Sequence, residues 1–221
     1  MVGRRKYDND GCAVAHGLDL VGERWALLVV RELLLGPKRF TDLRAGLPGV
    51  SADMLTQRLR ELTEAGIVSR RRLAAPAASW VYELTEWGAE VEPVVLALAK
   101  WSSRSPGMRA DAPIGIDSVV LELRTMFDPA EARGFRASIA LRLNESWFRL
   151  SFDNGALDAK RADVAPAGTD AALLTDPNTL SALVTGRLSL AEAEASGALE
   201  LTGNRTVVQR ALGLFPLPAP A

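Results

Sequence analysis

Three features of the 221-residue sequence predict an α+β fold with two domains. Helix start and stop signals fill the first half, which also contains a two-stranded pattern before its last helix. Strand-like alternation follows in the second half. Between the halves, residues 101–113 are rich in Ser, Pro and Gly and have no apolar period, which indicates a linker. The expected divisions are a first domain at 1–104, a linker at 105–114, a second domain at 115–215 and a tail at 216–221.

The first half is expected to contain short helices followed by a hairpin. Ser51 is a good N-cap for the fourth helix, and Gly66 suits the left-handed residue that follows a helix. Thr85 is expected to cap a long last helix that contains Pro93. The expected elements are helices over 12–21, 25–35, 40–45 and 51–66, strands over 68–73 and 80–84, and a helix over 85–103.

The second half is expected to be a mixed α/β domain. The turn 153–155, Asp-Asn-Gly, lies between two alternating segments and is a strong hairpin signal. Helix starts are expected at Asp128-Pro129 and Asp176-Pro177, where a capping residue precedes a proline. A capping box of Ser189 and Glu192 predicts another helix. The expected strands are 119–127, 135–143, 147–152 and 156–161.

In the first half, the order of helices, turn, capped helix and hairpin is that of a winged helix-turn-helix. At about 100° per residue, three residues of the fourth helix share one side and would be buried: Leu55, Leu59 and Leu62. Four polar residues point the other way: Asp53, Thr56, Gln57 and Arg60. Because Gln can pair with adenine and Arg with guanine in the major groove, this helix is the expected recognition helix of a DNA-binding domain.

Basic residues flank the expected recognition helix. The run Arg70 to Arg72 leads into the hairpin, and Lys38 and Arg39 precede the third helix, so these cations would neutralise DNA phosphates. A solvated charge run is the alternative interpretation of the arginines. Arg58, on the flank of the helix, suits either a phosphate or an intramolecular partner. The complete set of expected DNA contacts is Lys38, Arg39, Thr41, Ser51, Asp53, Thr56, Gln57, Arg58, Arg60, Arg70, Arg71 and Arg72.

Five segments of the first half resemble a known family. They are Cys12, GERW at 22–25, LLLGPKRFTDL at 33–43, LTQRLRELTEAGIV at 55–68 and YELTEWG at 82–88. Together they resemble the HxlR-type winged helix-turn-helix transcriptional regulators over residues 10–102.

The resemblance implies a homodimer, joined through the first and last helices of the domain, that binds a palindromic operator in double-stranded DNA and represses transcription. It also implies DNA contacts by Gln57, Arg58 and the wing residues Arg70 to Arg72. The wing tip, Ala74 to Ser79, departs from this pattern because it carries no charge, which puts minor-groove contact by the tip in doubt.

Cys12 is the only cysteine and lies where some members of this family carry a redox-sensing thiol. Sensing needs a lowered pKa and exposure. The nearby cations Arg4 to Lys6 would favour a lowered pKa, whereas Asp8 and Asp10 would oppose it. An inert, partly buried cysteine is the alternative. His16 is the only histidine, has no metal-binding neighbours in the sequence, and is expected in a helix or dimer interface.

The order of signals over residues 176–204 resembles the sterol-carrier-type fold, and the match extends over residues 115–215. The resemblance implies a five-stranded sheet, backed by helices, around an apolar tunnel that takes a lipid-like ligand. This half would then be an effector domain, and the alternatives are a plain core or a surface for dimer or protein contact. The expected lining residues are Phe135, Trp147, Phe148, Phe152, Leu180, Leu183, Val184, Leu188 and Val208.

The sequence argues against an enzyme, a membrane protein and a secreted protein. One histidine and one cysteine exclude most catalytic triads, and there is no phosphate-binding loop or metal-ligand spacing, so neither cofactor nor metal is expected. A charged N-terminus and short apolar runs predict a cytoplasmic protein without a membrane partner. Two alternatives to a ligand-controlled regulator are a redox regulator acting through Cys12 and a lipid carrier with a vestigial DNA-binding domain.

Overall fold

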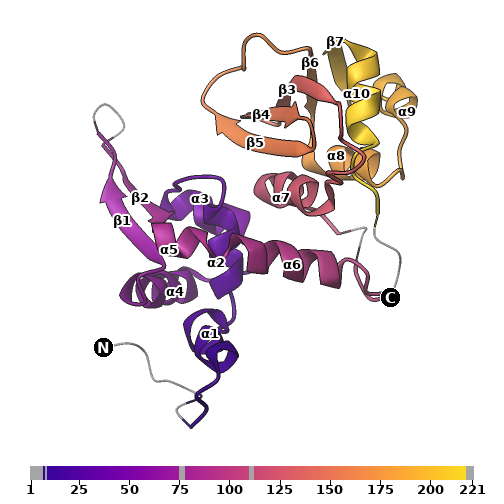
Figure 1. Ribbon diagram of the computed structural model, residues 1–221. Helices are drawn as coiled ribbons and strands as arrows, with labels where there is room; N and C mark the ends of the chain where they lie inside the picture. The colour runs from indigo at the N-terminus through magenta and orange to yellow at the C-terminus, as the bar shows by residue number, and fades with distance from the viewer. Residues whose placement is uncertain (1–6, 8, 75–77, 110–111, 218–221) are drawn as a thin grey trace. The chain divides into compact units, whose positions relative to one another are not determined.

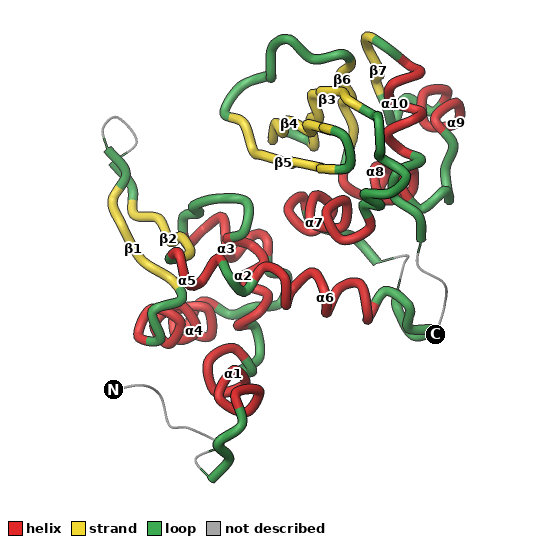
Figure 2. Tube along the Cα trace, viewed as in Figure 1, coloured by secondary structure: helices red, strands yellow, loops and turns green. Residues whose placement is uncertain are grey.

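The computed structural model describes residues 7, 9–74, 78–109 and 112–217 (Figures 1 and 2). It forms two compact units, Met1–Val95 and Leu96–Ala221. Helix α6 begins in the first unit and continues into the second.

The first unit has the predicted order of helices followed by a hairpin. Its elements are α1 (Ala13–Val21), α2 (Ala26–Leu33), α3 (Phe40–Gly46), α4 (Ala52–Glu64), β1 (Val68–Arg72), β2 (Trp80–Leu84), α5 (Glu86–Ala89) and α6 (Glu92–Ser102). The prediction of one long helix after Thr85 is wrong, because the chain forms α5 and α6 there. A proline has no N–H and its ring clashes with the carbonyl four residues earlier, so Pro93 is accommodated only in the first turn of a new helix.

Helix α4 lies on the core of the first unit. The Ser51 hydroxyl accepts a hydrogen bond from the Met54 amide at 3.2 Å, as expected of an N-cap. Gly66 has φ +74°, which ends the helix in the left-handed conformation. The predicted stripe of Leu55, Leu59 and Leu62 is fully buried against α2, α3 and β1, so the opposite side of α4 is left to solvent.

Strands β1 and β2 form an antiparallel wing whose register pairs Val68 with Leu84 and Arg72 with Trp80. The loop before α3 is attached to this wing by two backbone hydrogen bonds. The Lys38 amide donates to the Tyr82 carbonyl at 2.9 Å, and the Tyr82 amide donates to the Lys38 carbonyl at 2.8 Å. The wing is therefore fixed to the segment that leads into the helix-turn-helix.

The buried carboxylate of Glu32 connects α2 to the loop before α3. Glu32 in α2 is 2% exposed, and its oxygens accept from Arg31 Nη2 at 2.8 Å and Lys38 Nζ at 2.5 Å. Gly46, at the end of α3, lies against this carboxylate so closely that a Cβ at that position would overlap it. A side chain at position 46 would therefore have to displace the Glu32 carboxylate from its two cations.

The second unit is a mixed α/β domain, as predicted. Its elements are α7 (Ile116–Met126), β3 (Arg136–Leu143), β4 (Ser146–Asp153), β5 (Ala156–Ala162), β6 (Ala171–Thr175), α8 (Pro177–Val184), α9 (Leu190–Ala195), β7 (Glu200–Gly203) and α10 (Arg205–Leu212). The sheet has five strands in the order β5-β4-β3-β6-β7, with β3 and β6 parallel and the other pairs antiparallel. Side chains of α7, α8 and α10 pack together on one face of this sheet.

Two expectations for the second unit are wrong, and strands β6 and β7 lie outside the expected strand ranges. Residues 119–127 were expected to form a strand, but they lie in α7 and the first position after it. The buried Val119, Val120, Leu123 and Met126 follow helical spacing, which outweighs the strand preference of the valines. Asp128-Pro129 starts turns rather than a helix, with Asp128 accepting from the Ala130 amide at 2.8 Å. Strand β6 was not predicted because its short apolar run has no clear alternation.

We expect Glu32→Gln to lower the free energy of unfolding by about 3 kcal/mol, because it leaves the Arg31 and Lys38 cations without their buried carboxylate. Urea denaturation followed by tryptophan fluorescence measures the change. Glu64→Gln is the matched control, since Glu64 faces Arg60 in an exposed pair at 3.8 Å. Such a pair is worth about 0.5 kcal/mol or less. Equal losses in the two variants would contradict the structural role of Glu32.

Candidate nucleic-acid interface

The outward side of α4 presents Asp53, Thr56, Gln57 and Arg60, all exposed. The Arg60 side chain is 69% accessible and lies 3.8 Å from Glu64, and Gln57 Nε2 donates to Glu61 Oε1 at 3.0 Å. Both contacts lie on the exposed surface of the helix, where such pairs contribute little. Gln57 and Arg60 can therefore exchange these partners for the edges of bases at small cost. Ser51, also exposed, is engaged as the N-cap of the same helix.

Arg58 has the intramolecular role that was one of its two expected roles. It is 4% exposed, and its guanidinium pairs with Glu61 in α4 and, at 3.8 Å, with Glu23 in the segment before α2. Its Nε atom is buried without a hydrogen bond. Arg58 therefore links α4 to a preceding segment of the chain and does not share the exposed side of Gln57 and Arg60.

The residues that precede and begin α3 also include both an internally paired cation and exposed side chains. Lys38 is bonded to Glu32 and only 15% of its side chain is accessible, so it is a structural cation in this conformation. Arg39 is exposed immediately before α3. Thr41 is exposed in the first turn, with its hydroxyl 3.3 Å from Asp42. Arg39 is therefore the cation of this segment that faces solvent.

The three wing arginines are exposed, and each is held by a different contact. The Arg70 guanidinium lies over the Trp80 ring at 4.6 Å from its centroid and 5.7 Å from that of Tyr82. Arg71 donates to both oxygens of Glu83 at 2.8 Å, and Arg72 Nε donates to the Ala78 carbonyl at 3.2 Å. Stacking over an aromatic ring positions a guanidinium without occupying its hydrogen-bond donors.

Trp80 and Tyr82 were not among the expected site residues. The signal for them is the hairpin register, which pairs Arg70 with Tyr82 and Arg72 with Trp80 across the wing. Residues 75–77 of the uncharged wing tip lie outside the described part of the chain.

Cys12 is exposed and occupies the N-cap position of α1. The backbone amides of Val14 and Ala15, in the first turn of α1, lower the pKa of its thiol. The expected neighbours Arg4 to Lys6 lie outside the described residues. His16 is exposed on α1, and the described residues contain no cluster of His, Cys, Asp and Glu that could hold a metal ion.

Large apolar side chains are exposed along α1 and α6. Val14 and Leu18 are one turn apart on α1, and Val94, Leu98 and Trp101 follow the same spacing on α6. Trp101 is 72% exposed. Exposed apolar stripes of this kind are typical of surfaces that associate with a partner.

The residues expected to line a tunnel in the second unit instead form its core. Phe148, Phe152, Leu180, Leu183, Val184 and Val208 are buried, and Phe135, Trp147 and Leu188 are half-buried. A space of only about 20 Å³ remains beside Phe152, Leu180 and Val208. The rings of Phe127, Phe135 and Phe215 pack around Phe152 at centroid distances of 5.3–6.5 Å and fill this region. In the described part of the chain, these residues therefore pack as a core around a space of about 20 Å³, and they do not line a tunnel there.

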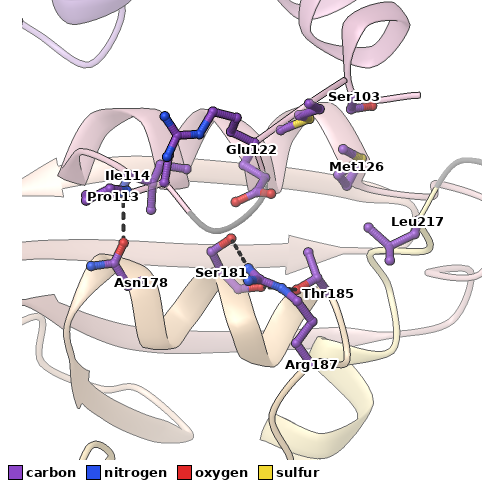
Figure 3. A pocket seen from close by; sticks show the side chains of 13 residues that line it. Ser103, Pro113, Ile114, Glu122, Met126, Asn178, Ser181, Thr185, Arg187 and Leu217 are labelled. Carbon is purple, nitrogen blue, oxygen red and sulfur yellow. Dashed lines mark hydrogen bonds between the residues drawn. The ribbon is translucent and has the colours of Figure 1, made fainter. Parts of the chain in front are cut away.

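A larger cavity, of about 540 Å³, lies elsewhere in the second unit and borders α7 and α8 (Figure 3). None of the nine expected lining residues contributes to it.

No helix in the described part of the chain is long and apolar enough to cross a membrane.

Comparison with family models assigns the two halves separately. The HxlR-like helix-turn-helix model matches residues 20–108, and the alkyl sulfatase C-terminal model matches residues 123–221. The second match does not confirm the sterol-carrier-like assignment, although the expected five-stranded sheet is present.

The curated relatives match the first half. The uncharacterized HTH-type transcriptional regulator YdeP of Bacillus subtilis is 35% identical over 97 residues, which cover 44% of this chain and 76% of YdeP. The uncharacterized regulator YybR of the same organism is 38% identical over 96 residues, 43% of this chain and 77% of YybR. The solved structure of the redox regulator HypR in its oxidized form is 36% identical and covers 41% of this chain and 94% of HypR, with a TM-score of 0.39. The chain thus belongs to the HxlR-like helix-turn-helix family of transcriptional regulators, with an alkyl-sulfatase-C-terminal-like domain behind the DNA-binding half.

Proposed function

We propose that this regulator binds a palindromic operator as a homodimer and represses the genes that the operator controls. The observation that carries the proposal is the division of α4 into a buried leucine side and an exposed side with Gln57 and Arg60. In a helix-turn-helix, the exposed side of the capped second helix enters the major groove and reads base edges. Repression is inferred from the family resemblance.

The exposed cations around α4 have a separate role in this proposal. Arg39 before α3 and Arg70 and Arg72 on the wing would contact phosphates, which fix the register of the protein without reading sequence. Arg70 is presented by Trp80 and Tyr82 with its donors available. Base reading is thus assigned to α4, and phosphate binding to Arg39 and the wing.

Fluorescence anisotropy tests the proposal with labelled DNA from the region upstream of the protein's own gene and a scrambled duplex as control. At near-physiological salt we expect a preference of about a thousandfold for the natural sequence. Gln57→Ala and Arg60→Ala should each remove about 1–3 kcal/mol of binding free energy from the natural site only. Arg70→Ala should weaken binding to both duplexes and flatten the salt dependence. Parallel losses on both duplexes for all three variants would contradict the division of roles.

The homodimer is proposed to form through the exposed apolar sides of α1 and α6. These two helices expose Val14 and Leu18, and Val94, Leu98 and Trp101, respectively, whereas the leucines of α4 are buried. Covering apolar area at about 25 cal/mol per Å² is the driving force for association. A palindromic operator has the same twofold symmetry as such a dimer.

Leu98→Glu should shift the protein from dimer to monomer in sedimentation velocity, because it places a charge in the middle of the apolar stripe of α6. Lys100→Glu is the matched control, since Lys100 is exposed on another side of the same helix. The proposed interface would be wrong if the two variants sedimented alike.

The second unit is proposed to be a regulatory rather than a catalytic domain. It contains neither histidine nor cysteine, the side chains most often used for proton transfer and for nucleophilic attack by sulfur. A small apolar or lipid-like effector bound there would alter DNA affinity if it favoured one dimer geometry over another. No cofactor is part of the proposal.

A second candidate is redox control through Cys12, which is favoured by the exposure and lowered pKa of the thiol. A low pKa increases the thiolate fraction, and the thiolate is the species that oxidants attack. We expect diamide to release the operator from the native protein and to have no effect on Cys12→Ser. The same release from both proteins would rule out the thiol as the switch.

A further inference from the structure

The cavity of about 540 Å³ in the second unit has the size of a small-molecule site (Figure 3). Its apolar wall includes Ile114, Met126 and Leu217, and its polar wall includes Glu122 of α7 and Ser181 of α8. The rim is fixed by the Asn178 side chain, whose oxygen accepts from the Ile114 amide at 3.0 Å. The cavity is therefore a preformed space with one apolar wall and one polar wall.

Glu122 is the polar group of this cavity whose hydrogen bonding is incomplete. It projects from α7 towards Ser181 and Arg187 (Figure 3). Its Oε2 atom is buried and has no hydrogen-bond partner in the structure. Burial raises the pKa of Glu122, while Ser181 and the charge of Arg187 oppose the rise. An unsatisfied buried carboxylate oxygen is costly, and a bound donor would remove that cost.

Arg187, in contrast, has partners within the cavity wall. Its Nε donates to the Thr185 hydroxyl at 2.9 Å, and its Nη2 donates to the Ser181 hydroxyl at 3.4 Å. It also balances part of the charge of Glu122. The acceptor Oε2 of Glu122 is therefore the group that lacks a partner, and it suits a head group that donates a hydrogen bond, which would share the cavity with Arg109 and Arg187.

We propose that this cavity binds a small aliphatic amine, with its head group on Glu122 Oε2 and its apolar chain against Ile114, Met126 and Leu217. A protonated amine gains a charge-assisted hydrogen bond to the carboxylate, which is stronger than one between neutral groups. The apolar chain adds the burial of its methylene groups against these three side chains. Binding needs no DNA, so it can be tested whatever the result with the operator.

Isothermal titration calorimetry of the full chain tests the site with three probes of equal chain length: octylamine, octanol and octanoate. We expect octylamine to bind about tenfold or more tightly than the other two. Glu122→Gln keeps the shape of the side chain and should abolish this preference. Glu145→Gln, whose side chain is 91% accessible and lies outside the cavity, is the matched control and should keep it.

Leu217→Arg gives an independent check on an exposed position that should leave folding intact. A cation at this edge of the cavity should weaken octylamine binding and leave octanoate unaffected or strengthened. Three outcomes would overturn the proposal: no heat with any probe, binding of octanoate at least as tight as that of octylamine, or an unchanged preference for the amine in Glu122→Gln.

Discussion

The DNA-binding half depends on one buried carboxylate, that of Glu32. It lies in α2, binds Lys38 of the loop before α3, and occupies the space that a side chain at position 46 would need. Lys38 is in turn bonded through its backbone to Tyr82 of the wing. One buried charge therefore joins the second helix, the third helix and the wing, and a charge buried in this way is stable only while its partners remain in place.

This connection explains how exposed side chains on different elements are presented together. Helix α4 is oriented by its buried leucines and by Arg58, which bonds to Glu23 as well as to Glu61. The wing is oriented by the Lys38–Tyr82 bridge, and the same Tyr82 lies under the guanidinium of Arg70. The exposed residues proposed to touch DNA are thus placed by buried polar contacts directly beneath them.

The sequence was informative where the signal was local. Ser51, Gly66 and the Asp-Asn-Gly turn at 153–155 specify their structures through neighbours in the chain, and the leucine spacing of α4 fixes its buried side. The sequence did not decide between a phosphate and an intramolecular partner for Arg58, because its second partner, Glu23, lies 35 positions earlier in the chain. Glu122 could not be found for a similar reason: its segment was interpreted as a strand, and its environment is created by α8.

Helix α6 crosses the boundary between the two compact units without a break, and the HxlR-like match extends beyond it to residue 108. The division between the two units after Val95 falls inside α6, so the protein cannot be cut there without interrupting this helix. A truncation there would cut the helix before Leu98 and Trp101, and so remove two of the three residues of its apolar stripe. A shortened variant that keeps α6 and its apolar stripe whole therefore has to end after Ser102.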